Sequence, residues 1–590
     1  MDMDKLVPDA GNLTGFIEQF EVFAGAPGGV DKLREMILKL AVAGKLHDQD
    51  KTVNSVTLLE SLRSQKTELI KSKKIRRGKA LPEVKEGLFE IPKHWVWACL
   101  GEWGDWGSGA TPSRSISAYY GGAIPWFKSG ELTGGIIKVS NETITESAVE
   151  KSAVKLCTVG DVLLAMYGAT IGKTAILGVE ATTNQAVCSC TCFEGVDNNF
   201  LLLLLKSFNS YFIGQGAGGA QPNISREKII NTPAPLPPLE EQKRIVAKVD
   251  ELMALCDKLE IQQQQQANNV LRANTAAINA LLNPADPKSS FEQNWQRIAH
   301  HFNTLYGCTL PMPKGEGRKK KHLVGLENVK ALKAAIKQLG IMGTLTEPSS
   351  IEGLAVTELN VIKKEIAELY KKRDIKKPKK INNCDELKSF SIPKSWEWIQ
   401  LGEVCHHVAD GPHFSPKYVD DGTGVLFLSG RNIKESGIDF NTAKHVSKSD
   451  HLEFCKRVEP KNGDILYTKG GTTGVATVNR TNEKFSVWVH VAVLQFSQDK
   501  VYPEYIAMAL NSPHCYSQSQ LYTHGIGNKD LGLTRMVNIT LPFPPYEEQK
   551  RIIAKVDQLM TLCDQLEQQL TQSYSDAEKL MQATVKALVA

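Results

Sequence analysis

Residues 240–250 read Glu-Glu-Gln-Lys-Arg-Ile-Val-Ala-Lys-Val-Asp, and residues 547–557 read Glu-Glu-Gln-Lys-Arg-Ile-Ile-Ala-Lys-Val-Asp. The match continues through Leu-Cys-Asp at 255–257 and at 562–564. Upstream, the pattern Ile-Pro-Lys-x-Trp-x-Trp at 91–97 returns at 392–398. The offset of about 300 residues is far longer than the roughly 20 to 50 residues of a solenoid repeat. The chain is therefore a duplicated module, in which a variable region precedes a nearly invariant segment.

Each invariant segment has the pattern of one long helix. A proline pair, at 237–238 and at 544–545, ends the preceding extended stretch, and a glutamate pair opens the first turn, where the helix dipole favours negative charge. Apolar residues then follow at alternating spacings of four and three, which is typical of a coiled-coil seam. The predicted seam residues are Ile245, Val249, Leu252, Cys256 and Leu259 in the first copy, continuing through Gln263, Gln266, Val270 and Ala273, and Ile552, Val556, Leu559, Cys563 and Leu566 in the second copy.

The two helices are expected to have equal length. Each spans about 43 residues, or about 65 Å at 1.5 Å per residue. Equal lengths and repeated seams favour pairing of the helices with each other over two unrelated surface helices.

The regions between the conserved segments look mixed α/β. Short strand-like runs at 162–167 and 465–468 each lead into a glycine-rich turn, and 201–208 and 504–511 look helical. The fold class is therefore predicted as α/β with added long α-helices. The predicted organisation is an N-terminal helical region (1–87), a first globular domain (88–238), a central conserved helix (239–283), a polar linker (284–325), a helical and basic region (326–387), a second globular domain (388–545) and a C-terminal conserved helix (546–590).

Composition excludes several classes of protein. Apolar residues at 42% and charged residues at 23% are ordinary globular values, which argues against a mainly disordered or fibrous chain. The longest aliphatic stretch, Leu201–Leu205, is far shorter than the roughly 20 residues of a membrane helix. The acidic N-terminus shows no secretory signal, and the 12 scattered cysteines without a CxxC pair look like reduced thiols. A cytoplasmic protein with no membrane association is expected.

Candidate catalytic and metal-binding patterns are weak. The segment 168–174 resembles a phosphate-binding loop, but three residues separate its glycines where a Walker A loop has four. The alternatives are a tight turn between strands, or a turn that meets DNA through its backbone, its threonines and Lys173. Cys188, Cys190 and Cys192 alternate along one strand, which favours buried apolar side chains over zinc ligands. No catalytic residues and no metal site are predicted.

Basic clusters recur at matching positions ahead of each globular domain, at 71–79 and 371–380. A single run of this kind is usually a solvated surface. Because the run recurs at the same place in the module, contact with phosphates is an equal alternative.

Together these motifs resemble the DNA-specificity subunit of type I restriction-modification systems. The similarity covers nearly all of the chain from about residue 33, and its most specific elements are the segments 235–245 and 542–552, the Ile-Pro-Lys-x-Trp-x-Trp patterns, 107–113 and 218–225. The resemblance implies two target-recognition domains, each reading one half of a split DNA sequence, held apart by an antiparallel pair of conserved helices. It also implies a non-catalytic chain that recruits two methyltransferase subunits, which bind S-adenosylmethionine, and restriction subunits that use ATP and Mg²⁺.

The residues expected to contact double-stranded DNA lie in loops of both domains. In the first domain they are Tyr167, Gly168, Thr170, Lys173, Gly219, Gln221 and Asn223. In the second domain they are Asp410, His413, Arg431, Asn432, Lys469, Thr472, Thr473, Asn528 and Lys529.

Three other classes of function stay open at this point, the third being a self-contained enzyme, either a methyltransferase or a nuclease. The chain could serve a methyltransferase that has no restriction subunit, or it could be a DNA-binding module unrelated to methylation. A self-contained methyltransferase would need an Asn/Asp-Pro-Pro-aromatic motif, yet Pro544-Pro545-Tyr546 follows Phe543. A self-contained nuclease would need a PD-(D/E)xK-like cluster, and none stands out.

Overall fold

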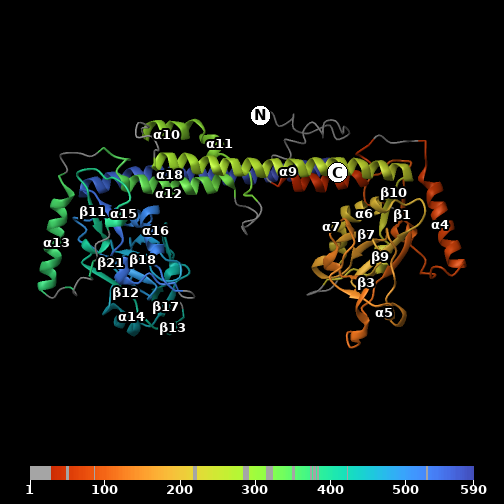
Figure 1. Cartoon of the computed structure of the whole chain (residues 1–590), viewed down its shortest axis with the longest axis horizontal. Coiled ribbons are helices and arrows are strands. Elements are labelled where there is room, and N and C mark those ends of the chain that lie inside the picture. The colour runs from red at the N-terminus through yellow and green to blue at the C-terminus, as the bar shows by residue number, and fades with distance from the viewer. Residues whose placement is uncertain are drawn as a thin grey trace. The chain divides into compact units, whose positions relative to one another are not determined.

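The computed structural model describes residues 28–47, 52–84, 87–216, 222–283, 291–313, 323–347, 353–372, 375, 380–381, 385–420, 423–525 and 529–589. The chain divides into two compact units. The first contains Met1–Gln265 and Tyr574–Ala590, and the second contains Gln266–Ser573. Figure 1 shows that each unit has a small domain of strands and short helices close to the start of a long helix.

The strands of the first unit form three sheets. A five-stranded sheet has the order β2-β9-β6-β7-β4, a three-stranded sheet has the order β5-β3-β8, and β1 pairs antiparallel with β10. The strands are β1 (Val96–Cys99), β2 (Gly104–Ser108), β3 (Tyr120–Phe127), β4 (Ile136–Ile137), β5 (Thr143–Ile144), β6 (Val162–Ala165), β7 (Thr174–Leu177), β8 (Thr182–Thr183), β9 (Val187–Cys192) and β10 (Pro233–Leu236). The predicted strand at 162–167 is therefore confirmed as β6.

The second unit repeats this plan with different strand lengths. Two four-stranded sheets have the orders β12-β21-β18-β19 and β13-β17-β14-β20, β15 pairs with β16, and β11 pairs antiparallel with β22 as β1 does with β10. The strands are β11 (Glu397–Gln400), β12 (His407–Asp410), β13 (Tyr418–Val419), β14 (Val425–Leu428), β15 (Ile433–Lys434), β16 (Gly437–Ile438), β17 (Lys444–Val446), β18 (Ile465–Thr468), β19 (Ala476–Val478), β20 (Phe485–Val487), β21 (Val491–Gln495) and β22 (Thr540–Phe543).

Helices cover these sheets and supply much of each core. In the first unit, α6 lies against β6 and β7 and also against α3, so its whole aliphatic run Leu201–Leu205 is buried. The helices of the first unit are α3 (Gly29–Val42), α4 (Ser55–Lys71), α5 (Glu146–Lys151), α6 (Asn198–Ser207), α7 (Asn209–Gln215) and α8 (Arg226–Ile230). Those of the second are α10 (Phe291–His300), α11 (Phe302–Tyr306), α12 (Val324–Met342), α13 (Ala355–Lys371), α14 (Lys448–Cys455), α15 (Pro503–Leu510), α16 (Pro513–Leu521) and α17 (Leu533–Met536).

The two long helices connect the units in opposite directions. Helix α9 (Leu239–Leu282) begins in the first unit and ends in the second, whereas α18 (Tyr546–Val589) begins in the second and ends in the first. Each has 44 residues, close to the predicted 43. This connectivity is that of an antiparallel pair and confirms the predicted fold class.

The beginning of each long helix uses its seam to hold its own unit together. Ile245, Val249, Leu252 and Cys256 share one core with α3 and α6, and Ile552, Val556 and Cys563 share another with α12 and α15. Leu259, Leu559 and Leu566 are half-buried against the same cores. In these first halves the predicted seam residues are therefore buried or half-buried, as expected. Pairing of the two long helices alone does not account for this burial, because α3 and α12 carry apolar faces that also require cover.

Matched ion pairs confirm where α3 and α12 lie. On α3, Arg34 pairs with Asp257 and Glu260 of α9, both at 2.7 Å. On α12, Lys333 pairs with Asp564 at 2.6 Å and with Glu567 at 2.9 Å, both on α18. Each short helix is thus held on the first half of its long helix in the same way.

Further along α9 the buried stripe moves by one residue from the predicted seam. Ala267 and Asn274 are buried, whereas Gln266 and Ala273 are exposed. A straight α-helix has 3.6 residues per turn, so a stripe that faces one direction drifts away from a strict 3.5-residue repeat after a few heptads. The predicted positions Gln266 and Ala273 were wrong for this reason.

A buried carboxylate joins each domain to its long helix. Glu241 in the first turn of α9 is 1% exposed and accepts hydrogen bonds from the indole N–H of Trp95 and from His94 Nε2 at 3.0 Å. Glu548 of α18 is also 1% exposed and accepts from the indole of Trp396 at 2.9 Å. Both tryptophans belong to the Ile-Pro-Lys-x-Trp-x-Trp pattern, so the two repeated motifs bind each other.

The neighbouring glutamine completes each joint. Gln242 accepts from Asp197 N at 2.8 Å and donates to Pro237 O at 2.9 Å, and Gln549 accepts from Tyr502 N at 2.9 Å and donates to Pro544 O at 2.9 Å. Through these bonds the start of the long helix holds the N-terminus of α6 or α15. The glutamate pair therefore does more than complement the helix dipole. Its second member, Glu241 or Glu548, accepts the tryptophan hydrogen bond that joins the domain to its long helix, and we call this contact the joint.

Glycine ends α3 and α12 where the same motif packs over the chain. Gly44 and Gly343 have φ values of 71° and 73°, a left-handed conformation that favours glycine. A Cβ atom at Gly343 would lie 2.6 Å from Pro393 Cγ, and one at Gly44 would lie 2.6 Å from Pro92 Cγ. The proline of the repeated motif can sit here only because the side chain is missing.

One predicted boundary is corrected. The segment 284–325 was predicted as a polar linker, but it contains α10 and α11 and the start of α12. Phe291, Trp295 and Ile298 lie at helical spacing on α10 and pack into the core of the second unit beside Leu281. Their spacing provides an apolar face that an extended linker would leave in water.

Among the described residues, none of the helices combines the length and the apolar character needed to cross a membrane.

Replacing Glu241 by alanine should destabilise the first unit. The change leaves the buried indole N–H of Trp95 without its acceptor, so we expect the free energy of unfolding to fall by about 1–3 kcal/mol. The matched control is Glu240→Ala, since Glu240 is exposed and bonds Lys243 at 2.8 Å on the same helix turn; it should change stability by less than about 0.5 kcal/mol. Chemical denaturation of both variants measures the difference, and equal effects would contradict the role of the buried carboxylate.

Candidate nucleic-acid interface

In the first domain the predicted contact residues meet on one loop surface. The backbone N–H of Gly168 donates to Pro222 O at 2.8 Å, and Tyr167 forms an isolated bridge with Asn223, so the 167–173 loop lies beside the 222–224 segment. The side chain of Tyr167 is 43% exposed. The structure brings together the predicted residues Tyr167, Gly168, Thr170, Lys173 and Asn223, while Gly219 and Gln221 lie outside the described residues.

The corresponding loop of the second domain has the same backbone bonds and different side chains. Gly471 N donates to Lys529 O, as Gly168 N donates to Pro222 O, which aligns Gly470 with Tyr167. At Gly470 a Cβ would lie 2.1 Å from His490 Nδ1. The place that a tyrosine occupies in the first domain is thus taken by His490 from the neighbouring turn, so one scaffold offers different chemistry in its two copies.

Lys469 is the next difference between the domains. Its ammonium group lies 2.8 Å from Asp530 Oδ1 and 3.4 Å from Asp410 Oδ2, and it donates to Val489 O at 3.1 Å. Arg457 adds a contact to the Asp410 carboxylate and donates to Asp410 O at 2.7 Å. Burial raises the pKa of Asp410, but the Arg457 hydrogen bond and the Lys469 charge outweigh it and hold this pKa below its usual value.

Four predicted contacts of the second domain are buried and build the loops from inside. The side chains of Asp410 and Lys469 are 2% and 5% exposed. The amide of Asn432 accepts from Ser429 N at 2.9 Å and donates to Asp439 O at 3.0 Å, and the hydroxyl of Thr473 accepts from Thr523 at 3.1 Å. The polar groups of these four residues are engaged within the protein, so the expectation that they are exposed surface contacts is corrected, although Asn432 still borders the groove described next.

Two of the exposed predicted residues line a groove. Arg431 and Thr472 line it, Lys529 is exposed on the loop that bonds Gly471, and His413 is exposed at the end of the charged network around Asp410. Asn528 lies outside the described residues. The groove is lined by Tyr418, Phe427, Ser429, Gly430, Arg431, Asn432, Lys434, Asp439, Thr442, Lys444, Gly470, Gly471, Thr472, Trp488 and His490. The separate sequence segments 429–432 and 469–474 are therefore neighbours in space.

Sequence reasoning missed the aromatic and lysine side chains of this groove. Tyr418 is 41% exposed and the ammonium of Lys444 lies 4.0 Å from its ring centroid. The rings of Trp488 and His490 meet edge to face at 4.7 Å. Burial and the charge of Lys469 lower the pKa of His490, which favours the neutral ring. The signal that the sequence offered was the presence of aromatic residues within polar, turn-rich stretches.

The electrostatics of the groove suit a polyanion. Among the residues that the structure describes, its charged lining consists of the three basic residues Arg431, Lys434 and Lys444 and the one carboxylate of Asp439. Basic side chains neutralise phosphates, an arginine can bond a guanine edge with two hydrogen bonds, and apolar ring surface can contact a thymine methyl group. The groove thus combines donors, positive charge and ring surface, which are the elements of a nucleic-acid contact.

A metal or nucleotide site has little support in the described part of the chain. No three or more histidine, cysteine, aspartate or glutamate side chains there are grouped to hold a metal ion. The phosphate-loop-like segment 168–174 is a tight turn that includes a short 3₁₀ helix at Gly168–Thr170 and leads from β6 into β7.

Comparison with known proteins identifies the domain. The family model described as Type I restriction modification DNA specificity domain matches residues 92–269 and 393–573. The specificity subunit of the type I restriction enzyme EcoAI of Escherichia coli is 28% identical over 571 residues, which cover 91% of this chain and 90% of that protein. The EcoEI specificity subunit of the same species is 27% identical over 620 residues and 97% of each chain.

Solved structures of low identity are also similar. The HsdS subunit from Thermoanaerobacter tengcongensis has a TM-score of 0.38 at 17% identity over 86% of this chain and 99% of that one. A chain from a structure of complex assembly and conformational transition in a type I R-M system has a TM-score of 0.44 at 18% identity, over 85% of this chain and 99% of that one. The two matched segments cover more than half of the sequence and fall on the two copies of the module. The chain belongs to the family of type I restriction modification DNA specificity domains and contains two copies of that domain.

Proposed function

We propose that this chain is the DNA-specificity subunit of a type I restriction-modification complex in the cytoplasm. Each globular domain reads one half of a bipartite double-stranded target, and the long helices set the spacer between the halves. The observation that carries this proposal is the duplicated domain, whose two copies share one backbone frame and present different side chains at the same loop, Tyr167 in one and Gly470 under His490 in the other. A common frame with divergent contacts suits two half-sites of different sequence.

The chemistry is assigned to partner subunits. Two methyltransferase subunits supply S-adenosylmethionine-dependent methylation, and restriction subunits supply cleavage with ATP and Mg²⁺. The repeated joints at Glu241 and Glu548 support two equivalent docking frames, one in each unit. The family and its relatives EcoAI and EcoEI, named as specificity subunits of restriction enzymes, favour this assignment over a specificity subunit that serves a methyltransferase alone.

The purified chain alone should not transfer methyl groups. Incubation with tritiated S-adenosylmethionine and DNA that carries the target should leave the DNA unlabelled. Adding the methyltransferase partner should start methylation and reach a plateau at two partners per chain, because each unit carries one joint. Methylation by this chain in the absence of a partner would contradict the proposed non-catalytic role.

Substitutions in one domain should affect one half-site only. Arg431→Ala should relax recognition of the half-site read by the second domain, at a cost of about 1–3 kcal/mol in binding free energy if the guanidinium bonds a base. Lys173→Ala should act on the other half-site, so each variant is the control for the other. Binding of the complex to a library of single-base target variants measures both, and a change in both half-sites from either variant would contradict the domain assignment.

Lengthening both long helices should lengthen the spacer. Seven residues inserted after Gln265 in α9 and after Ser573 in α18, where the helices pass between the units, keep the buried stripe nearly in phase and add about 10.5 Å. That length corresponds to about 3 base pairs at about 3.4 Å each, with both half-sites unchanged. Three residues inserted at the same places are the out-of-phase control and should impair assembly. An unchanged spacer length together with full activity would show that the long helices do not set the distance between the two half-sites.

A further inference from the structure

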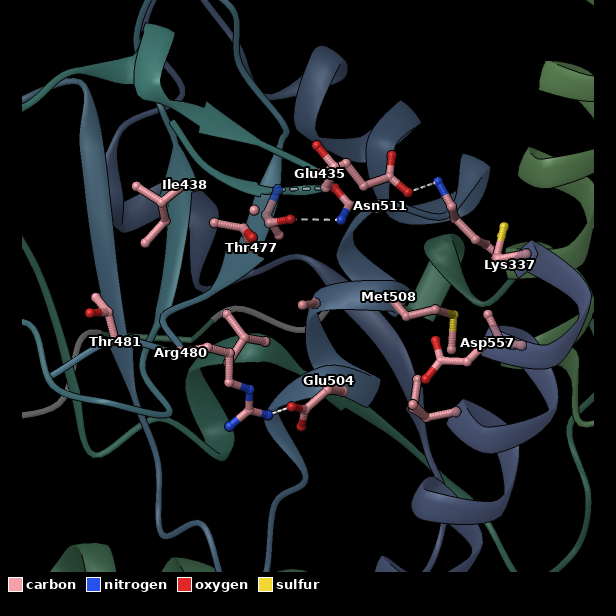
Figure 2. Close-up of a pocket in the computed structure, with 18 of the residues that line it drawn as sticks. Lys337, Glu435, Ile438, Thr477, Arg480, Thr481, Glu504, Met508, Asn511 and Asp557 are labelled. Carbon is pink, nitrogen blue, oxygen red and sulfur yellow. Dashed lines mark hydrogen bonds and ion pairs between the residues drawn. The ribbon is translucent and has the colours of Figure 1, made fainter. Parts of the chain in front are cut away.

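A second cavity, which shares no lining residue with the groove, lies within the second unit where the domain meets its long helix. It measures about 570 Å³ and is walled by α12, α15, α18 and strands of the domain (Figure 2). Its apolar wall is formed by Met508 of α15 and by Ile553, Val556 and Met560 of α18. The charged residues around it are Lys337, Glu435, Arg480, Glu504 and Asp557.

Four of these five charged groups neutralise each other. Lys337 forms an ion pair with Glu435, and Arg480 forms one with Glu504. Asp557 is left over, and Figure 2 shows its carboxylate without a bonded partner. No hydrogen bond or ion pair to this carboxylate is found within the described residues. Burial raises the pKa of Asp557, and no neighbouring cation acts in the opposite direction. The lining of the cavity therefore includes one carboxylate, on an exposed residue of α18, that no described cation neutralises.

In the first unit, the aspartate equivalent to Asp557 has a cation near it. Asp250 is the counterpart of Asp557 in the repeated segment. Helices α6 and α15 are aligned by the bonds of Gln242 and Gln549 to their N-termini. This alignment places Lys206 of α6 at the position of Asn511, the residue that follows α15. The charge of Asp250 raises the pKa of Lys206 against the larger lowering caused by burial. In the first unit a lysine thus supplies the positive charge.

The end of Lys206 lies in the equivalent place. Its Cε would be 3.5 Å from a Cβ built on Gly134, in the loop that precedes β4. Strand β4 pairs with β7. In the second unit, the turn 435–436, which lines the cavity, connects β15 and β16, and both strands contact β19, the counterpart of β7. The aliphatic chain of Lys206 therefore runs through the region that is open in the second unit.

Asn511 cannot replace that lysine. Its Oδ1 accepts from Ala476 N at 2.9 Å and its Nδ2 donates to Ala476 O at 2.8 Å, so the whole amide is used to hold β19 (Figure 2). The second unit consequently lacks both the methylene chain and the ammonium group that the first unit supplies from within.

We propose that this cavity is a binding site for an alkylammonium group, the chemistry of a lysine side chain. The ammonium pairs with Asp557, and the methylene chain lies against Met508, Val556 and Met560. Two sources offer this chemistry, a free aliphatic amine and a lysine side chain of the methyltransferase partner; only the second rests on the proposed function.

The probe for the site is n-butylammonium, which is the lysine side chain without its backbone. Ligand-observed saturation-transfer NMR on the full chain should show saturable binding, with n-butanol, which lacks the charge, at least tenfold weaker. Asp557→Asn should raise the dissociation constant at least tenfold, whereas the matched control Asp250→Asn should leave it unchanged. Binding that does not saturate, or that Asp557→Asn does not alter, overturns the proposal.

A gain of binding tests the equivalence of the two units. Lys206→Ala removes the internal occupant of the first unit, so one bound n-butylammonium per chain should become two. The added site should disappear when Asp250→Asn is introduced into the same chain. If Lys206→Ala folds with an unchanged melting temperature and gains no site, the comparison with the first unit fails and the proposal with it.

Whether the bound alkylammonium group is a free amine or a lysine of the partner is tested by the affinity of the full chain for its methyltransferase partner. A tenfold loss in Asp557→Asn with no loss in Asp250→Asn assigns the occupant to a lysine of the partner. Unchanged affinity, together with retained n-butylammonium binding by the wild-type chain, assigns it to a free amine. Both results keep the site, and neither depends on which DNA sequence is recognised.

Discussion

The hydrogen bond from a buried tryptophan indole to a buried glutamate organises both halves of this protein. Trp95 lies ahead of the first domain and Glu241 follows it, so their bond closes the whole domain onto the start of α9, and Trp396 and Glu548 do the same for α18. A buried carboxylate without partners would be costly, which ties the two motifs to each other. The antiparallel pairs β1–β10 and β11–β22 lie next to these bonds and connect the same parts of the chain.

With the joint held in this way, the loops of each domain are free to differ. The first domain exposes Tyr167 on its loop, whereas the second places His490 over Gly470 and uses Lys469 as an internal ion-pair centre. Positions that share backbone hydrogen bonds thus carry unrelated side chains. This separation between a constant frame and variable loops is what a protein that reads two half-sites requires, and it accounts for the uneven divergence along the sequence.

The apolar stripe of each long helix has two structural roles. The first turns of the helix complete the core of a domain together with α3 or α12, and the stripe then continues through the part of the helix that belongs to the other unit. Matched ion pairs from Arg34 and Lys333 hold the short helices in the same register on both copies. Because the domain core and the helix stripe share residues such as Ile245 and Ile552, the orientation of a domain is coupled to the helix that carries it.

The sequence by itself determined the duplication, the two long helices, the strands β6 and β18, the burial of most seam residues and the family, because these depend on local periodicity and on repeated motifs. Only the tertiary structure decided which polar residues are exposed. Asp410, Lys469, Asn432 and Thr473 looked like surface contacts but are buried. The partners of Asp410, Lys469 and Thr473 come from segments far away in the chain, whereas the amide of Asn432 bonds residues of its own loop. The tertiary structure also decided the burial of Glu241, the groove at Trp488 and the shift of the stripe to Ala267, because burial follows from packing in three dimensions and from the 3.6-residue turn of a straight helix.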